Sequence, residues 1–273
     1  MIVEFWGTRS LIPLAASLPR QFGGNTACVC IRETDDIAVV FDCGTGAAAL
    51  GGSHELSSVS QAHFFISKYS WDRIQGLPFT APLYRENFSA DFYALTADDG
   101  DLEDLLTAQM RYEFFPVQFR SMPCRRRFHH LTCADEQHKS VPVSPWPYGT
   151  MTAIKLHPRC PESAFKWLYR DTALAYAVHI DWEHPYPSSE YLLKELDNLQ
   201  LLITNLPENE RAWQNFWQYQ LLAQPQLTVF SDFSPYLEDQ FISSVLKQAQ
   251  TKLTEINGSS QIQAACDGLR INI

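Results

Sequence analysis

The sequence predicts a layered fold of the α/β or α+β class, in which strands alternate with helices. Short apolar runs bounded by Gly, Asp, Asn or Ser fill the first hundred residues. Apolar stripes at the helical period alternate with further short strands towards the C-terminus. Hydrophobic residues form 45% and aromatic residues 13% of the 273 positions, so the chain can build a large core.

Four early strands give the expected first sheet. Each is a short run of apolar residues, and the runs are Val3–Trp6, Cys28–Arg32, Ile37–Phe41 and Ala62–Ser67. Cys28 and Cys30 alternate on one strand, so both thiols face the same side and are expected in the core.

The last third predicts three helices interleaved with strands. The helices are expected at Glu190–Leu199, Glu208–Leu222 and Tyr236–Gln250, and the strands at Leu201–Thr204, Leu227–Phe230, Ile262–Ala264 and Leu269–Ile273. The middle helix has a stripe of large apolar residues, and we interpret it as core packing rather than a cofactor site: Trp213, Phe216, Trp217 and Leu221.

The charge balance argues against a nucleic-acid binder. The chain has 21 Lys and Arg against 31 Asp and Glu, a net charge of −10, whereas phosphate backbones are held by basic residues. The N-terminus lacks a secretory signal, and the longest apolar run, Ala173 to Ile180, is too short to cross a bilayer. Seven cysteines without a CxxC pair fit a reducing compartment. We therefore expect a cytoplasmic protein with no membrane association.

One segment carries a recognisable motif where an apolar strand ends in a polar loop. It reads Ile-Ser-Lys-Tyr-Ser-Trp-Asp-Arg-Ile-Gln-Gly-Leu-Pro-Phe over residues 66–79. It resembles the metallo-β-lactamase superfamily of hydrolases, in which this place reads Ser-His-x-His-Trp-Asp-His-Ile-Gln-Gly-Leu-Pro-Phe.

Other stretches match in the order of the same family, in the branch of ribonuclease Z-like and cyclic phosphodiesterase-like enzymes. They are Phe5–Ser10, Phe22–Thr26, Phe41–Gly46, Ala81–Tyr84, His157–Pro158, Val229–Phe230 and Ala265–Leu269. The resemblance spans nearly the whole chain. It implies a four-layer αββα metallo-β-lactamase sandwich and a single domain over residues 1–273.

The resemblance also implies a metal site, because the family holds two zinc-class ions that convert bound water to hydroxide. Here Lys68 and Ser70 occupy the positions of the first two motif histidines, and Arg73 replaces the last. Only Asp72 keeps its ligand type. A protonated ammonium or guanidinium has no lone pair to donate and repels a dication.

Most of the later ligand positions of the family also hold other residue types in this chain. His157 matches the next family histidine, while the bridging aspartate position holds His179, or Asp181 after a two-residue slip. Ser231 stands where the final histidine follows its strand, and Asn205 where family enzymes show His-Asp. The expectation is therefore no metal cofactor. The alternative is one zinc held by Asp72, His157 and His179.

Two expectations follow from the substituted charges. Asp72 should lie within salt-bridge range of Lys68 or Arg73, because a buried lone carboxylate is strongly disfavoured. If the cleft still holds a ligand, Lys68 and Arg73 favour a small anion.

Three functions remain open on sequence alone. The preferred one is a non-catalytic member of the family that binds a protein partner or a small anionic ligand. The alternatives are a hydrolase of phosphodiester or ester substrates with a remodelled mononuclear site, and a structural subunit. A separate zinc knuckle is not expected at a further cluster of soft ligands, because its spacing fits no familiar zinc pattern: Cys124, His129, His130, Cys133 and His138.

Overall fold

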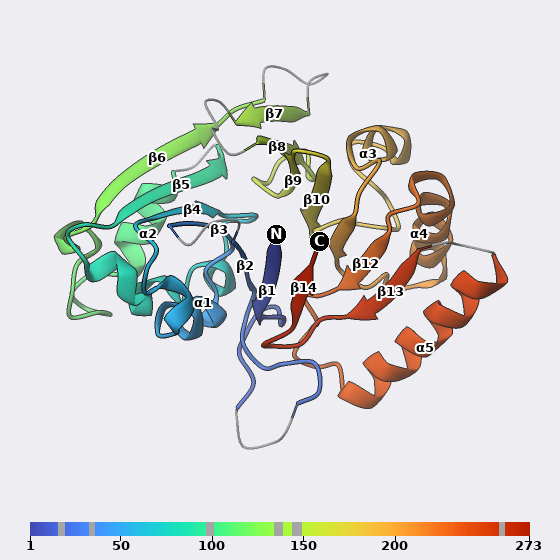
Figure 1. Cartoon of the computed structure of the whole chain (residues 1–273), viewed down its shortest axis with the longest axis horizontal. Helices are drawn as coiled ribbons and strands as arrows, with labels where there is room; N and C mark the ends of the chain where they lie inside the picture. Colours follow the sequence, from blue (N-terminus) through green and yellow to red (C-terminus); the bar gives the residue numbers. More distant parts are fainter. Residues whose placement is uncertain (16–19, 33–35, 97–100, 134–138, 144–148, 257–259) are drawn as a thin grey trace. The chain divides into compact units, whose positions relative to one another are not determined.

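The computed structural model describes residues 1–15, 20–32, 36–96, 101–133, 139–143, 149–256 and 260–273. The chain divides into two compact units (Figure 1). The first comprises Met1–Leu131 with Cys266–Asn272, and the second comprises Thr132–Ala265 with Ile273. Each unit contains one seven-stranded mixed sheet. That residues 1–273 act as one domain stays a prediction.

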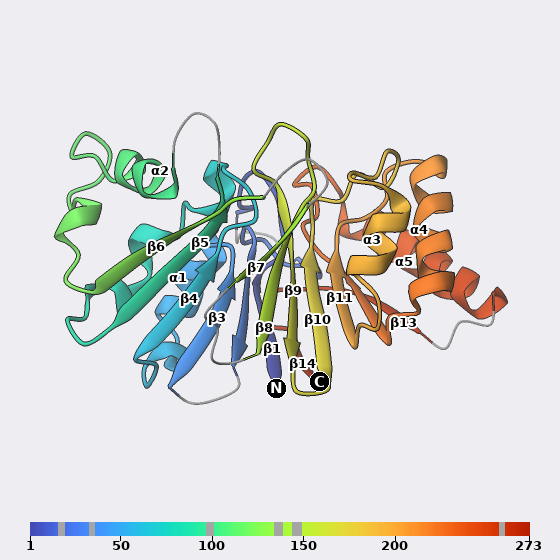
Figure 2. The ribbon, with the colours of Figure 1, turned by 90° about the horizontal axis from the view of Figure 1, so that it is seen from above.

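The sheet of the first unit is half antiparallel and half parallel. In spatial order its strands are β14 (Arg270–Asn272), β1 (Ile2–Gly7), β2 (Cys28–Arg32), β3 (Ile37–Phe41), β4 (Gln61–Phe65), β5 (Ser89–Leu95) and β6 (Arg125–Leu131). Neighbours from β14 to β3 are antiparallel, and those from β3 to β6 are parallel (Figure 2). The carboxyl ends of β3, β4 and β5 therefore meet at one edge, where ligands commonly bind in such sheets.

Two helices, α1 (Thr45–Gly51) and α2 (Leu102–Gln109), contribute to the core on one face of this sheet. Phe64 and Phe92 stack with ring centroids 5.0 Å apart and share one buried cluster with Leu50 of α1 and Leu106 of α2. Five short 3₁₀ segments complete the unit: η1 (His54–Leu56), η2 (Trp71–Arg73), η3 (Leu77–Phe79), η4 (Ala81–Tyr84) and η5 (Phe119–Ser121). Cys28 and Cys30 are fully buried, as predicted.

The sheet of the second unit is also half parallel and half antiparallel. Its strands in spatial order are β13 (Gln261–Ala264), β12 (Leu227–Phe230), β11 (Leu201–Thr204), β10 (Thr172–Ala177), β9 (Ser163–Tyr169), β8 (Thr150–Lys155) and β7 (Ser140–Val143). Neighbours from β13 to β10 are parallel, and those from β10 to β7 are antiparallel. The segments that follow β8, β10, β11 and β12 therefore leave the sheet at the same edge.

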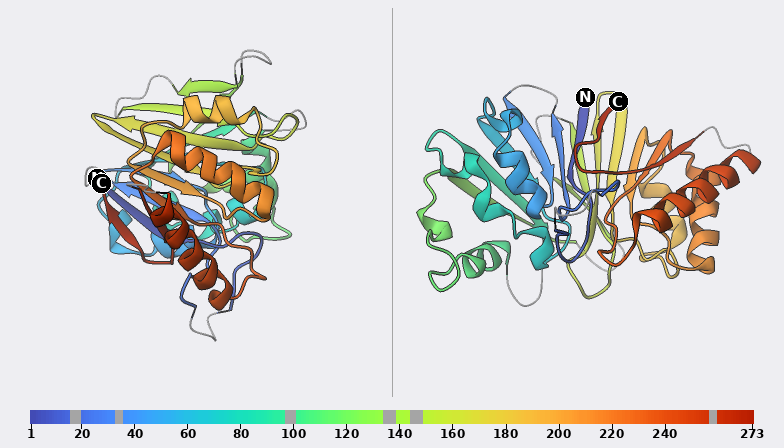
Figure 3. Two further views of the ribbon diagram at one scale, coloured as in Figure 1. Left: turned by 90° about the vertical axis from the view of Figure 1, so that its right-hand side faces the viewer. Right: turned by 90° about the horizontal axis from the view of Figure 1, so that it is seen from below.

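Three helices, α3 (Ser189–Glu195), α4 (Glu210–Ala223) and α5 (Asp239–Glu255), cover one face of this second sheet (Figure 3). The start of α4 is fixed by Asn209, whose side chain accepts the Ala212 N–H at 2.9 Å. The predicted core stripe of α4 is confirmed at Phe216, which is fully buried. It is wrong at Leu221, which is 46% exposed, because the helix turns Tyr219 and Gln220 inward instead.

The predicted strand ranges correspond to β1–β4 and β11–β14. The family resemblance also implies a strand that ends at Tyr176–Ala177, as β10 does, and a strand near Phe128–His129, as in β6, whereas β5, β7–β9 and helices α1 and α2 have no counterpart among the predictions. Helix α5 begins after Glu238 rather than at Tyr236, which lies outside it and is 81% exposed. None of the helices described here combines the length and the apolar character needed to cross a membrane.

Candidate functional site

The motif segment lies in the first unit, directly after the carboxyl end of β4. Residue Gly76 packs so closely on the turn after β3 that an added Cβ would lie 1.9 Å from the Gly44 carbonyl oxygen. The Cys43 N–H donates to the Arg73 carbonyl at 2.6 Å, and the Gly76 N–H donates to the Cys43 carbonyl at 2.9 Å. The loop after β3 and the loop after β4 are therefore packed and hydrogen-bonded together at the carboxyl ends of the parallel strands.

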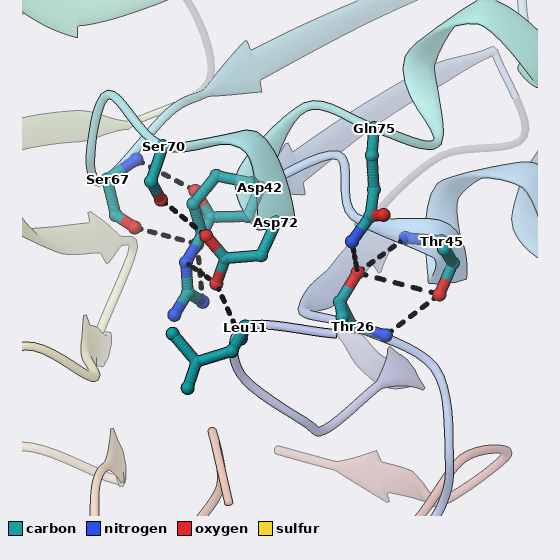
Figure 4. Close-up of polar contacts among 9 residues, drawn as sticks. Leu11, Thr26, Asp42, Thr45, Ser67, Ser70, Asp72 and Gln75 are labelled. Atoms are coloured by element: carbon teal, nitrogen blue, oxygen red, sulfur yellow. Dashed lines mark hydrogen bonds and ion pairs between the residues drawn. The ribbon is translucent and has the colours of Figure 1, made fainter. Parts of the chain in front are cut away.

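Asp42 is the first charged group of the site. It follows β3 in the left-handed conformation, with φ of 58°, and its side chain is fully buried. Its Oδ1 accepts the Ser67 N–H at 2.8 Å, and its Oδ2 accepts the Ser67 hydroxyl at 2.7 Å (Figure 4). The end of β4 thus fixes the carboxylate that follows β3.

Arg73 stands between two carboxylates. Its Nη1 lies 3.4 Å from Asp42 Oδ2 and its Nε lies 3.2 Å from Asp72 Oδ2, and the side chain is only 2% exposed. The predicted ion pair of Asp72 is therefore confirmed, with Arg73 as the partner. A delocalised guanidinium suits this place because it pairs with two carboxylates at once.

Asp72 has further donors besides Arg73. Ser70 Oγ donates to Oδ1 at 2.5 Å, and the Leu11 N–H donates to Oδ2 at 3.1 Å (Figure 4). Burial by itself would raise the pKa of Asp72, but the Arg73 charge and these hydrogen bonds outweigh it, so the pKa is lowered. Asp72 is therefore held as a carboxylate.

A hydroxyl and amide network supports the same loops. Thr26 Oγ1 accepts the Thr45 N–H and the Gln75 side-chain N–H, both at 2.8 Å, and Thr26 is fully buried. Thr45 Oγ1 in turn accepts the Thr26 N–H at 2.8 Å (Figure 4). Thr26 therefore links the loop before β2 to the start of α1 and to the motif segment.

Thr26→Val should lower the free energy of unfolding by about 2–6 kcal/mol, because it leaves the Thr45 and Gln75 donors without their acceptor at about 1–3 kcal/mol each. Urea denaturation measures the change. Thr107→Val is the matched control, because the buried Thr107 Oγ1 has no hydrogen-bond partner among the described residues, and it should be neutral or stabilising. Equal losses for the two variants would contradict the role of Thr26.

The other predicted site residues lie in the second unit, each after the carboxyl end of a strand. His157 follows β8, His179 follows β10, Asn205 follows β11 and Ser231 follows β12. Sequence reasoning thus placed four positions that the fold brings to one edge of that sheet.

His157, the histidine that best matches the family, uses the lone pair of its Nδ1 to accept hydrogen bonds from its own loop. His157 Nδ1 accepts the backbone N–H groups of Arg159 and Cys160 at 3.1 and 2.9 Å. A neutral imidazole that accepts at Nδ1 carries its proton at Nε2. In this arrangement His157 therefore closes its own loop and presents no free lone pair to a metal.

Two other candidates serve similar local roles. Asp181 Oδ1 accepts the N–H groups of Glu183 and His184 at 2.9 and 3.0 Å, and its side chain is 60% exposed. Asn205 uses its amide to accept the Ile180 N–H at 3.2 Å and to donate to the Ile180 carbonyl at 3.0 Å. Ser231 is buried and donates its N–H to Thr204, and His179 is half-buried.

The donor set does not fit the two zinc ions that the fold family implies. Among the residues that the structure describes, no three His, Cys, Asp or Glu side chains are grouped so that they could hold a metal ion. At the motif corner a guanidinium is in contact with both carboxylates. In the cluster of soft ligands from Cys124 to His138, His129 Nε2 lies 2.8 Å from Asp91 Oδ1, and His138 lies outside the described residues.

Sequence reasoning missed Asp42 as the second partner of Arg73. A signal was present, because Asp42 and the motif segment follow neighbouring strands and residues from such positions meet at one edge of a parallel sheet. The hydrogen bond from the Leu11 N–H to Asp72 had no signal in the sequence, because it depends on how the loop after β1 folds back towards the motif segment.

Several solved structures have the same fold as this chain. Human tRNase Z, short form, is 16% identical with a TM-score of 0.70, and the match covers 100% of this chain and 99% of that one. A diphosphatase from the PhnP family is 14% identical with a TM-score of 0.62, covering 100% and 97%. A metal-dependent hydrolase of the β-lactamase superfamily is 9% identical with a TM-score of 0.52, covering 100% and 99%.

Because all the sequence identities are low, these likenesses show the fold alone. The chain has the α+β fold of the metallo-β-lactamase superfamily, as the motif order predicts. No family model matches the sequence, and no curated protein matches it.

Proposed function

We propose that this chain is a metallo-β-lactamase-fold protein that acts by binding a protein partner rather than by hydrolysis through a metal-bound hydroxide. One observation carries the proposal: Arg73 occupies the motif corner as an ion-pair partner of Asp42 and Asp72. Its fixed positive charge there opposes a dication, and it cannot ligate one.

A protein partner is favoured over the small anion that Lys68 and Arg73 suggested. The guanidinium of Arg73 faces two carboxylates and is 2% exposed, so little of its charge is available to a ligand. Anion binding by Lys68 and Arg73 stays a prediction that competes with this one. Three large apolar side chains beside this corner are exposed, and we call them the rim: Leu11 at 55%, Ile12 at 48% and Trp71 at 63%.

The backbone conformation of Leu11 supports the proposal that the rim is exposed for binding. Leu11 has φ of 63°, a conformation that costs free energy for a residue with a branched side chain, and its N–H is held by Asp72. The Asp72 network therefore holds a strained loop that exposes two large apolar side chains, and exposed apolar patches commonly mark protein interfaces.

Metal analysis of protein produced with zinc and purified without chelator tests the catalytic half of the proposal. We expect well under one zinc per chain, and the same thermal midpoint with and without EDTA. The variant carrying Lys68→His, Ser70→His and Arg73→His should retain more zinc, because it removes two cations and adds three imidazoles. A full equivalent of zinc in the parent, removed together with hydrolysis of bis(p-nitrophenyl) phosphate, would refute the proposal.

Site-specific photocrosslinking tests the binding half. A photoreactive phenylalanine at position 71 should capture a defined cellular protein, and Leu11→Ser should reduce that capture. The matched control places the same residue at Tyr236, which is 81% exposed and lies in the second unit. Equal capture from both positions, or capture insensitive to Leu11→Ser, would count against the rim as an interface.

A further inference from the structure

Strand β6 forms one edge of the sheet of the first unit (Figure 2). It pairs in parallel with β5 on one side, and on its other side no strand pairs with it among the described residues. Six of the seven residues of β6 are exposed or half-buried, whereas six of the seven residues of β5 are buried. Within the described part of this unit, β6 therefore offers an edge to which a further strand can be added.

The hydrogen bonds to β5 show which main-chain groups of β6 face the open edge. The Arg125 N–H donates to the Phe88 carbonyl at 2.9 Å, and the Leu131 carbonyl accepts the Thr96 N–H at 2.9 Å. In a parallel pair the N–H and C=O of one residue point to the same side, and successive residues alternate between the two sides. The even-numbered residues therefore direct their N–H and C=O groups to the open edge: Arg126, Phe128 and His130.

The side chains of β6 give this edge a positive charge. Arg125, Arg127 and His129 alternate along the strand and so lie on one face of the sheet, and we call them the basic row. Among the described residues, the carboxylate that pairs with this row is Asp91, which lies 2.7 Å from Arg127 and 2.8 Å from His129. Two guanidinium groups thus share one carboxylate, and the row keeps an excess of positive charge.

The opposite face of β6 holds the strand in place. Phe128 stacks on Phe92 of β5 with ring centroids 5.2 Å apart. The Arg126 side chain donates to the Cys124 carbonyl at 3.1 Å and to the Arg120 carbonyl at 3.2 Å. The edge is therefore already formed before a partner arrives, which lowers the entropic cost of binding.

The charge of β6 distinguishes between the possible occupants of its edge. A second copy of the strand would place arginines opposite arginines, and like charges on paired strands are destabilising. A nucleic acid could pair with the arginines, but its phosphodiester backbone has no N–H groups for the outward carbonyls of β6, and the chain has a net charge of −10. An extended acidic peptide satisfies both the main-chain groups and the side-chain charges.

We propose that β6 binds an extended acidic segment of a protein partner by strand addition. The main chain of that segment bonds to the outward N–H and C=O groups of Arg126, Phe128 and His130. Its carboxylates recur at every second residue, because side chains on one face of paired strands lie opposite each other, and they face the basic row.

Nuclear magnetic resonance of the backbone amides tests the proposal directly. The probe is a capped peptide, Gly-Glu-Val-Glu-Val-Glu-Val-Gly, titrated into the full chain. Binding should be saturable, and it should shift the N–H signals of the even-numbered residues of β6 downfield and slow their hydrogen exchange. The odd-numbered residues already bond to β5 and should change less. The same peptide with Lys in place of Glu should not bind.

Methylated peptides separate strand addition from attraction between charges alone. N-methylation of the three valines blocks one edge of the peptide, and N-methylation of the three glutamates blocks the other. A strand pairs with β6 through one of its edges, so one of these peptides should lose binding and the other should keep it. Loss of binding by both, or by neither, would contradict strand addition.

Variants of the protein complete the test. Arg125→Gln should weaken peptide binding about 2- to 5-fold at low salt, the value of one exposed ion pair. Arg159→Gln removes an exposed arginine of the second unit and should leave the affinity unchanged. His130→Pro removes an outward N–H, which an edge strand tolerates, and should bind about 5-fold more weakly than His130→Ala.

Three results would overturn the inference. They are the absence of saturable peptide binding, amide shifts that do not alternate along β6, and binding of a nine-residue oligouridylate at β6 without binding of the peptide. The last result would assign the arginines to a nucleic acid instead. Each of these results leaves the proposal for the rim untouched, because Leu11, Ile12 and Trp71 lie outside β6.

Discussion

Arg73→Ala should lower the free energy of unfolding by about 3–5 kcal/mol, the usual cost of removing one partner of a buried ion pair. The loss is large because Asp42 and Asp72, which are 0% and 8% exposed, would both keep a buried charge without the guanidinium. Urea denaturation followed by circular dichroism measures it.

Two comparisons separate this effect from general damage. Arg111→Ala removes an arginine that is 61% exposed and pairs with Glu113, and surface pairs of this kind contribute about 0–1 kcal/mol. Asp72→Asn combined with Arg73→Ala should cost less than the sum of the single changes, because it removes one of the two stranded charges. If Arg73→Ala costs no more than Arg111→Ala, the network does not stabilise the corner.

Acid should destabilise the protein between about pH 6.5 and pH 4 through His63. This β4 residue is 4% exposed, and its Nδ1 lies 3.3 Å from Tyr93 Oη. Burial lowers the pKa of His63 to about 4, although the nearby Asp91 carboxylate opposes the shift. In the unfolded chain histidine takes up its proton near pH 6.5.

The direction follows from proton linkage. Between pH 6.5 and 4 the unfolded state binds the proton and the folded state does not, so stability falls as the pH falls through this window. The full loss is about 3 kcal/mol, since each unit of pKa difference corresponds to about 1.4 kcal/mol.

Urea midpoints recorded from pH 7 to pH 4 test this for His63→Gln. The variant should lose the His63 contribution and show a shallower dependence on pH than the parent. His54→Gln, at an exposed position, should keep the slope of the parent. Parallel pH curves for the parent and His63→Gln would show that His63 is not responsible.

The order of motifs along the chain predicted the fold because each motif sits at a strand end or a tight turn that the fold needs. Gly44 and Gly76 illustrate the constraint, since a side chain at either would collide with the neighbouring loop. Periodicity alone does not reveal the strands of the middle region, for a physical reason. Strand β6 begins with Arg125, Arg126 and Arg127, whose charges hide the period of two.

Asp91 shows how tertiary structure makes such a strand possible. Arg127 pairs with both oxygens of the buried Asp91 at 2.7 Å, and His129 contacts the same carboxylate at 2.8 Å. The Arg127 bonds, the His129 bond and the Gln61 bond outweigh burial and lower the pKa of Asp91 to about 2. The charge of Arg127 in β6 is therefore compensated by a residue of β5, which the local sequence does not reveal.

The sequence by itself determined which side chains stand in the motif segment, including the cationic Lys68 and Arg73. It also indicated that Asp72 needs a counter-charge, because a buried carboxylate requires one. Only the tertiary structure decided that Arg73 supplies it and shares itself with Asp42, and that Asp72 also binds the Leu11 N–H. Hydrogen-bond and ion-pair partners depend on distances of a few ångströms between distant segments, and those distances exist only after the strands have paired.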